Sequence, residues 1–363
     1  MSSIGPGARR RLVSLDWSRG AAVVFNLLMI AVLPPLPTAL VHAHWEGIHL
    51  VDLVFPTFVV LSGAGMAFAY ARTPSWWVVL RRSVVLWAAG LLYNAVVLDW
   101  PAPAEFRLMG PLQVYAVLVP VVAVASTRLR SPRAWAVAVA VLTVALTALH
   151  LAWGAHCGGV TPTCNPSRTL DLPWMGAHAY RGGARGHDPE GVVTLAGALV
   201  TVGVGLVAGA TVRTLHGTPG ARGRIITLIL LLVGACLAAG LVLHLLGVPV
   251  VKRLWTPSFA LLTAVPGLLV LLGAYLLLDA DGAPPASSLV RPVPEALGRN
   301  ALLGYFGSHL VLHQLTAGDP SVADRVVRLM GPDAGRWVFG IAFLAFWVAL
   351  ALVLARYRVY VRP

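Results

Sequence analysis

Ten apolar segments, each close to or above the length needed to cross a lipid bilayer, dominate this chain of 363 residues. A helix of about 20 residues spans the hydrocarbon core. The predicted spans are residues 20–40, 49–71, 79–98, 108–126, 134–153, 191–212, 225–246, 257–278, 298–316 and 336–355. Composition agrees, because only 11% of the residues are charged, against roughly 25% in soluble domains. The sequence therefore predicts an all-α polytopic membrane protein.

The basic residues predict how these spans are oriented. Short loops rich in arginine and lysine stay in the cytoplasm, and ten spans place both termini on the same side. Most of the 27 basic residues become cytoplasmic when both termini are cytoplasmic. We expect residues 1–19 to be a cytoplasmic segment and residues 20–363 to form one domain in the plasma or inner membrane. The net charge of +13 follows from this topology and does not indicate nucleic-acid binding.

The longest outer connection, residues 154–190, contains two cysteines seven positions apart, Cys157 and Cys164. Oxidising conditions outside the cytoplasm favour a disulfide, and two free thiols are the alternative. The loop ends in Asp188, Pro189 and Glu190. Because Asp, Pro and Glu are typical of a helix start, these residues are either a helix cap or part of a site.

Residues 42–56, HAHWEGIHLVDLVFP, gather titratable side chains at the mouth of the second span. Asp52 lies just inside that span, where a carboxylate needs a partner or a water-filled cavity. His42 is the candidate base or nucleophile. Asp52 either orients the His42 imidazole or forms a structural pair with Arg107. Three prolines before this stretch break the first helix near its outer end, and broken backbone at membrane depth indicates a cavity.

Three further polar residues are expected in the same outer half. Arg107 and Gln113 enter the fourth span, and Gln113 or Lys252 is a candidate oxyanion donor. Lys252 is the only lysine in the chain. Since an ammonium differs from a guanidinium in hydration and in ease of deprotonation, its retention here indicates either a specific role or chance.

The order of these motifs resembles the transmembrane acetyltransferase family typified by heparan-alpha-glucosaminide N-acetyltransferase. The resemblance begins with the LD and RG pairs at residues 15–20 and continues with H-x-x-W-x-G and DLVFP at residues 42–56. Later motifs of the family are R-x-x-G-x-L-Q, DPEG, K-x-L-W-x-x-S and G-x-N. Their matching residues include Arg107, Gln113, Asp188, Glu190, Lys252, Trp255, Ser258 and Asn300.

The resemblance implies that an acetyl group passes from cytoplasmic acetyl-CoA to an amino sugar or another glycan acceptor at the outer face. It implies that His42 is catalytic, and we expect Asp52 to support it. Binding of donor or acceptor is expected from Trp45, Glu46 and the later motif residues. Glu46 departs from the usual family residue, so acceptor choice is expected to differ.

A second function class stays open at the level of sequence. A multi-span transporter or exporter of a small solute or lipid-linked glycan also has broken spans and buried ionisable groups. The polar groups here are expected in the outer half of the membrane and not at its mid-depth, which favours the acyltransferase. We predict no metal site. The lipid bilayer is the expected environment, and a homodimer is left open.

Overall fold

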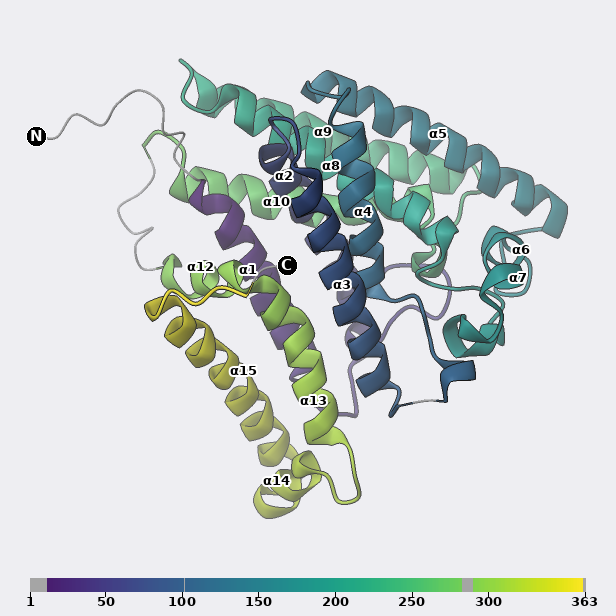
Figure 1. The fold of residues 1–363 in the computed structure, drawn as a ribbon, viewed down its shortest axis with the longest axis vertical. Helices are drawn as coiled ribbons and strands as arrows, with labels where there is room; N and C mark the ends of the chain where they lie inside the picture. The colour runs from purple at the N-terminus through teal and green to yellow at the C-terminus, as the bar shows by residue number, and fades with distance from the viewer. Residues whose placement is uncertain (1–11, 101, 283–289, 362–363) are drawn as a thin grey trace, which may run out of the picture.

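The computed structural model describes residues 12–100, 102–282 and 290–361, and these residues fold as a bundle of long helices (Figure 1). The first five long helices are α1 (Val13–Ile30), α2 (Val54–Ala69), α3 (Trp76–Val97), α4 (Pro111–Ala125) and α5 (Pro132–Cys157). Four long helices follow: α8 (Val192–Leu215), α9 (Ala221–Leu245), α10 (Pro257–Leu278) and α15 (Pro332–Arg356). The shorter helices α12 (Pro292–Arg299), α13 (Ser308–Thr316) and α14 (Val322–Met330) lie between α10 and α15. The helical fold class is confirmed.

Seven helices within the described residues are long and apolar enough to span a membrane. They are Val13–Ile30, Leu50–Ala69, Pro132–Cys157, Val192–Leu215, Ala221–Leu245, Pro257–Leu278 and Pro332–Arg356. The expected count of ten is thus supported only in part. Helix α3 is 22 residues long but contains Arg81 and Arg82 near its start. Helix α4 is apolar but has 15 residues, and the segment predicted at 298–316 is not one regular α-helix.

The predicted first span, residues 20–40, is wrong in its bounds. Helix α1 covers Val13–Ile30 and ends before Pro34, whose ring cannot continue a helix. The helix starts early because its first free N–H groups are capped from elsewhere in the bundle. The Asp279 carboxylate accepts hydrogen bonds from the backbone N–H groups of Val13 and Ser14, at 3.2 and 2.8 Å. Such a carboxylate also suits the positive end of the helix dipole.

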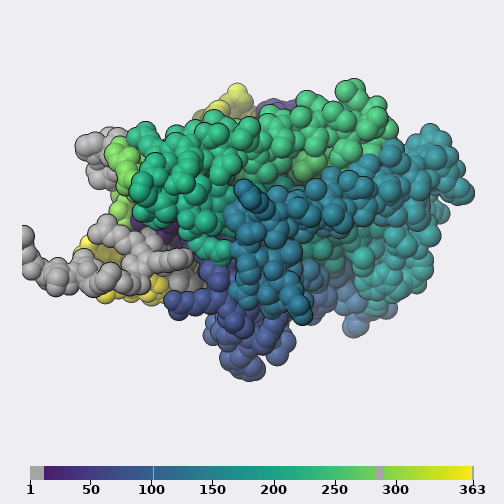
Figure 2. Space-filling view, turned by 90° about the horizontal axis from the view of Figure 1, so that it is seen from above, coloured from purple at the N-terminus to yellow at the C-terminus, as the bar shows by residue number. Residues whose placement is uncertain are grey.

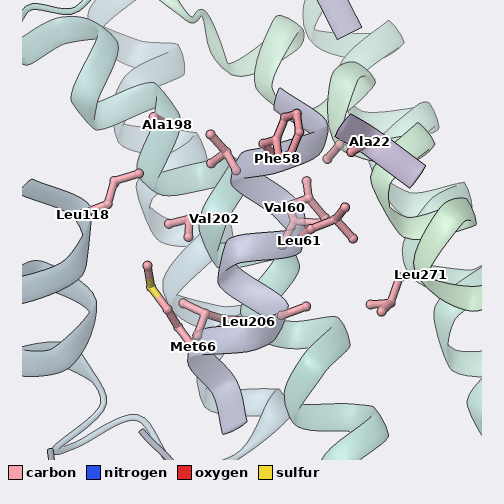
Figure 3. Close-up of a cluster of buried hydrophobic side chains, with 14 of the residues drawn as sticks. Ala22, Phe58, Val60, Leu61, Met66, Leu118, Ala198, Val202, Leu206 and Leu271 are labelled. Atoms are coloured by element: carbon pink, nitrogen blue, oxygen red, sulfur yellow. The ribbon is translucent and has the colours of Figure 1, made fainter. Parts of the chain in front are cut away.

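Helix α2 lies at the centre of the bundle, where α8 packs against it. Figure 3 shows side chains of α2 meeting those of α1, α4, α8 and α10 in one buried cluster. The two backbones approach closely at Gly205 of α8, where a Cβ atom would lie 2.0 Å from the Val60 carbonyl oxygen. Small residues allow this approach in membrane bundles. The rigid α2–α8 pair thereby sets the position of the first turn of α2.

The segment predicted as span nine is irregular. After α12 ends at Arg299, a short π-helix occupies Leu303–Gly307 and is followed by α13. The Asn300 side chain holds the C-terminal segment by two hydrogen bonds. It donates to the Val359 carbonyl at 3.2 Å and accepts from the Val361 N–H at 2.7 Å. A π-turn often marks a functional site, and Tyr305 within it faces the cavity described below.

The connection between α5 and α8 is folded into short helices, including α6 (Pro166–Leu170) and α7 (Leu172–Met175). It forms one end of the molecule beside α5, in teal in Figures 1 and 2. The predicted disulfide between Cys157 and Cys164 is present. Asp171 is fully buried and accepts a hydrogen bond from the Val192 N–H at 2.8 Å. This long connection is therefore anchored to the first turn of α8.

Candidate functional site

Three side chains from distant parts of the sequence meet at the start of α2. The Asp52 Oδ1 atom lies 2.7 Å from His42 Nδ1 and 3.0 Å from Lys252 Nζ. The same two nitrogen atoms are 2.9 Å apart. The Asp52 side chain is fully buried, whereas 56% of the His42 side chain is exposed. The His42 imidazole is therefore exposed at the protein surface, and the buried Asp52 carboxylate holds it through Nδ1.

Local backbone geometry explains why Asp52 points at His42. Asp52 is the last but one residue of a 3-10 helix, Leu50–Leu53, that directly precedes α2. Its second oxygen, Oδ2, accepts hydrogen bonds from the backbone N–H groups of Ala43 and His49, at 3.2 and 2.9 Å. The His49 ring in turn contacts the Val41 carbonyl through Nδ1 at 2.6 Å. A buried carboxylate with this many partners is rigid, and it fixes the loop that carries His42.

Lys252 reaches the site through pairing between two loops. Glu46 and Val251 form an isolated antiparallel β-bridge, and the Gly47 N–H donates to the Val250 carbonyl at 2.8 Å. Lys252 begins the next 3-10 helix, Lys252–Leu254. Sequence reasoning identified Lys252 as unusual, but its contact with His42, 210 positions away in the sequence, depends on this loop pairing.

A second ion pair lies close to the first. The Arg107 guanidinium contacts the Glu190 carboxylate, and both side chains are largely buried. Burial raises the pKa of Glu190, and the neighbouring Arg107 and Lys252 oppose that rise. The alternative that Arg107 pairs with Asp52 is wrong, because Asp52 is paired with His42 and Lys252 instead.

The cap interpretation of Asp188 is also wrong. Helix α8 begins at Val192 with Gly191 at the capping position. The Asp188 carboxylate accepts from the Tyr180 N–H at 2.7 Å and from the Glu190 N–H at 2.9 Å. Asp188 therefore shapes the turn that aims Glu190 at Arg107, and it does so from a fully buried position.

Trp45 connects the His42 loop to the disulfide-containing segment. Its indole N–H donates to the Val160 carbonyl at 2.9 Å, within the ring closed by Cys157 and Cys164. Its ring packs edge-on against His187 at 5.2 Å between centroids. Burial and the nearby Arg253 lower the pKa of His187 to about 4. Sequence reasoning missed His187, whose only signal was its position directly before Asp188.

A cavity of about 580 Å³ extends along α2 beneath this site. Its lining on α2 runs from Phe55 to Ala69, about 20 Å at 1.5 Å per residue. Phe55, at one end of this lining, follows Asp52 by three residues, while His42, Asp52 and Lys252 themselves are not among the lining residues. Aromatic and aliphatic side chains line most of the cavity. Its other end is polar and is lined by Asp16, Arg19, Arg81, Arg82 and Arg299.

Residues 11–180 match the family model described as heparan-alpha-glucosaminide N-acetyltransferase, catalytic. This match makes residues 11–180 similar to the family. The chain is thus a multi-pass membrane protein whose first half is similar to an N-acetyltransferase catalytic region. No curated protein matches the chain. The matched region contains His42, Asp52 and Arg107 but ends before Glu190 and Lys252, so the partners of this N-acetyltransferase-like region come from the second half of the chain.

Four of the predicted binding residues of this N-acetyltransferase-like chain make structural contacts away from His42. Gln113 is fully buried, with its Nε2 atom 3.5 Å from the Trp87 carbonyl. The Trp255 indole donates to Thr201 Oγ1 at 2.9 Å, and Ser258 Oγ donates to the Pro249 carbonyl at 2.8 Å. Asn300 holds the C-terminal segment, as described above. The structure brings together His42, Asp52 and Lys252, with Arg107 and Glu190 adjacent.

Proposed function

We propose that this protein is a membrane-embedded acyltransferase that moves an acetyl group from acetyl-CoA to an amino sugar or glycan acceptor. The observation that carries the proposal is the buried Asp52 carboxylate on Nδ1 of an exposed His42 imidazole. A carboxylate in this position orients the ring and stabilises the imidazolium that forms when the ring takes a proton. The Nε2 atom is then the base or nucleophile.

The reaction needs a proton acceptor for the attacking group. An acceptor amine or hydroxyl attacks the thioester carbonyl carbon, loses a proton to His42 Nε2, and the coenzyme A sulfur leaves as a thiol after taking a proton back. In the covalent variant, Nε2 itself attacks the thioester and later gives the acetyl group to the acceptor. Both variants require the same exposed imidazole.

The cavity along α2 is the proposed donor site. Its volume lies within the usual range for small-molecule sites. Arginines suit phosphate groups, because the guanidinium forms paired hydrogen bonds with phosphate oxygens. Arg81 and Arg82 at the polar end would bind the nucleotide phosphates of acetyl-CoA, and the apolar length toward Phe55 would hold the pantetheine arm. We place the polar end at the cytoplasm and His42 at the outer face.

The acceptor site is proposed on the outer side of His42. Trp45 offers an indole face to a sugar ring, and its place is set by the bond to Val160. Glu46 is half exposed, with its Oε1 atom 3.5 Å from His244 Nδ1. A carboxylate at this rim suits the ammonium group of an amino sugar or a sugar hydroxyl.

The direct test is acetyl transfer by purified protein in lipid vesicles, followed by mass spectrometry of the product. The acceptor panel would contain glucosamine and neutral sugars. We expect His42→Ala to lower kcat by a factor of about 10² to 10⁴, the usual contribution of a general base. The matched control is His156→Ala, because His156 is exposed at the end of α5. Coenzyme A release that is equal in wild type and His42→Ala would refute the proposed role.

The donor site is tested by the double variant Arg81→Gln and Arg82→Gln. We expect KM for acetyl-CoA to rise about tenfold or more while kcat changes little, since these side chains would contact the nucleotide and not the thioester. Arg222→Gln is the control, because Arg222 donates to the Asp281 carbonyl and does not line the cavity. An unchanged KM in the double variant would exclude this cavity as the donor site.

A further inference from the structure

His42, Asp52 and Lys252 form a triangle in which every side has hydrogen-bond length. The nitrogen-to-oxygen sides measure 2.7 and 3.0 Å, and the nitrogen-to-nitrogen side measures 2.9 Å. A hydrogen bond between two nitrogen atoms holds one hydrogen, so either Lys252 donates to His42 Nδ1 or His42 Nδ1 donates to Lys252. The two arrangements place the imidazole proton on different ring nitrogens.

The charge on Lys252 limits which of these two arrangements is possible. A lysine ammonium has three hydrogens and no lone pair. It can donate to both Asp52 Oδ1 and His42 Nδ1. In that arrangement a neutral His42 carries its single proton on Nε2, and the 2.7 Å contact between Nδ1 and Oδ1 holds no hydrogen. A neutral lysine amine has a lone pair, so His42 Nδ1–H is shared between Asp52 Oδ1 and Lys252 Nζ, and Nε2 keeps its lone pair.

We propose that Lys252 is a positioning residue that selects the tautomer of His42. The ammonium form holds His42 with its proton on Nε2, where the ring has no lone pair for a proton or an acyl group. The neutral form frees Nε2. The catalytic consequence rests on the proposed function, but the tautomer selection is a property of the three side chains alone.

The surroundings of Lys252 suit a group that changes its charge. Its side chain is 24% exposed, which leaves it a route to exchange a proton with solution. The charged groups that act on it are Asp52 and Glu190, which favour the ammonium, and Arg253, which opposes it. Burial lowers the pKa of Lys252. Arg107 pairs with Glu190, and this pairing reduces the electrostatic stabilisation of the Lys252 ammonium by the Glu190 carboxylate.

The residue type supports the same conclusion. Lys252 is the only lysine among 27 basic residues. An arginine can also form an ion pair with a carboxylate, yet it would remain charged at every accessible pH. A side chain that must give up its proton has to be a lysine here.

The test uses diethyl pyrocarbonate, an electrophile that reacts with an unprotonated imidazole nitrogen. Its carbonyl carbon bonds to Nε2, monoethyl carbonate leaves, and the Nδ1 proton passes to that leaving group through solvent. Peptide mapping by mass spectrometry measures labelling at His42 separately from labelling at Lys252. Exposed His156 is the internal reference. The full-length protein is labelled in lipid vesicles without donor or acceptor.

Two variants of Lys252 should act in opposite directions. Lys252→Arg keeps a permanent charge beside Nδ1, whereas Lys252→Met removes it and leaves Asp52 to hold Nδ1–H. At pH 7 we expect His42 in Lys252→Met to react at least about tenfold faster than in Lys252→Arg, the factor that corresponds to one pKa unit. Equal rates, or a faster reaction in Lys252→Arg, would overturn the proposal.

The unaltered protein supplies a test that does not depend on a variant folding. Between pH 6 and pH 9, the labelling rate of His42 relative to His156 should rise with pH, because burial lowers the pKa of Lys252 and so moves the loss of its proton to lower pH. A constant ratio would contradict tautomer selection by Lys252. Absence of acetyl transfer by the wild-type protein would refute the proposed function while leaving these labelling results unaffected, so the two failures are distinguishable.

Discussion

Replacement of Asp52 by asparagine is the perturbation that the structure constrains most sharply. The substitution preserves size and shape and removes one negative charge from a fully buried position. It leaves the Lys252 ammonium without the carboxylate 3.0 Å away. It also places an amide NH₂ where Oδ2 or Oδ1 now accepts hydrogen bonds, so at least one donor among Ala43, His49 and Lys252 loses its acceptor.

The size of the effect follows from these contacts. Two unit charges 3 Å apart attract by about 5 kcal/mol at an effective dielectric constant of about 20. Part of this attraction is offset, because the asparagine no longer carries a buried charge and the partly exposed Lys252 gains hydration. Breaking one partner of a buried pair typically costs about 3–5 kcal/mol. We expect the lower end, about 3 kcal/mol, which is a factor of about 150 in the unfolding equilibrium.

The assay is titration with sodium dodecyl sulfate of protein in mild detergent micelles, followed by circular dichroism. The matched control is Asp99→Asn, since the Asp99 side chain is 82% exposed and pairs with His313 at 3.2 Å. Exposed pairs of this kind contribute below about 1 kcal/mol. If Asp52→Asn unfolds at the same detergent fraction as Asp99→Asn, the claim that Asp52 anchors the His42 loop is refuted.

Two further predictions concern the scaffold of the site. Gly205→Ala should destabilise the bundle by about 1–3 kcal/mol, because the new Cβ atom would overlap the Val60 carbonyl oxygen. Gly234→Ala on α9, where a Cβ meets nothing within 4 Å, should be neutral or stabilising in the same unfolding assay. Replacement of both Cys157 and Cys164 by serine should lower stability by about 2 kcal/mol. It should also raise KM for the acceptor, because Val160 then holds Trp45 less firmly. An acceptor KM equal to that of wild type would contradict this link.

The class of the protein followed from local sequence properties. Apolar length predicts membrane helices without any knowledge of their neighbours, which is why the bounds of the span at 257–278 agree with α10. Bounds failed for the first span, where the cap on α1 comes from Asp279, far along the chain. The disulfide could also be predicted from the sequence, because the two cysteines are only seven positions apart.

Motif order identified His42 and Asp52 as a pair, since ten residues and one loop separate them. Sequence could not say which of two basic residues pairs with Asp52. Arg107 and Lys252 both stood in matching motifs, and only the packing of the loop before α10 against the His42 loop brings Lys252 to the carboxylate. The same packing sends Arg107 to Glu190.

The sequence by itself therefore determined a helical membrane protein with a titratable cluster at the start of its second span. The tertiary structure decided which charges meet in that cluster and where the cavity beneath it runs. The physical reason is the distance along the chain between the residues that interact. Burial of apolar helices and short loops depends on neighbouring residues, whereas an ion pair between residues 200 positions apart depends on how α2, α8 and α10 pack together.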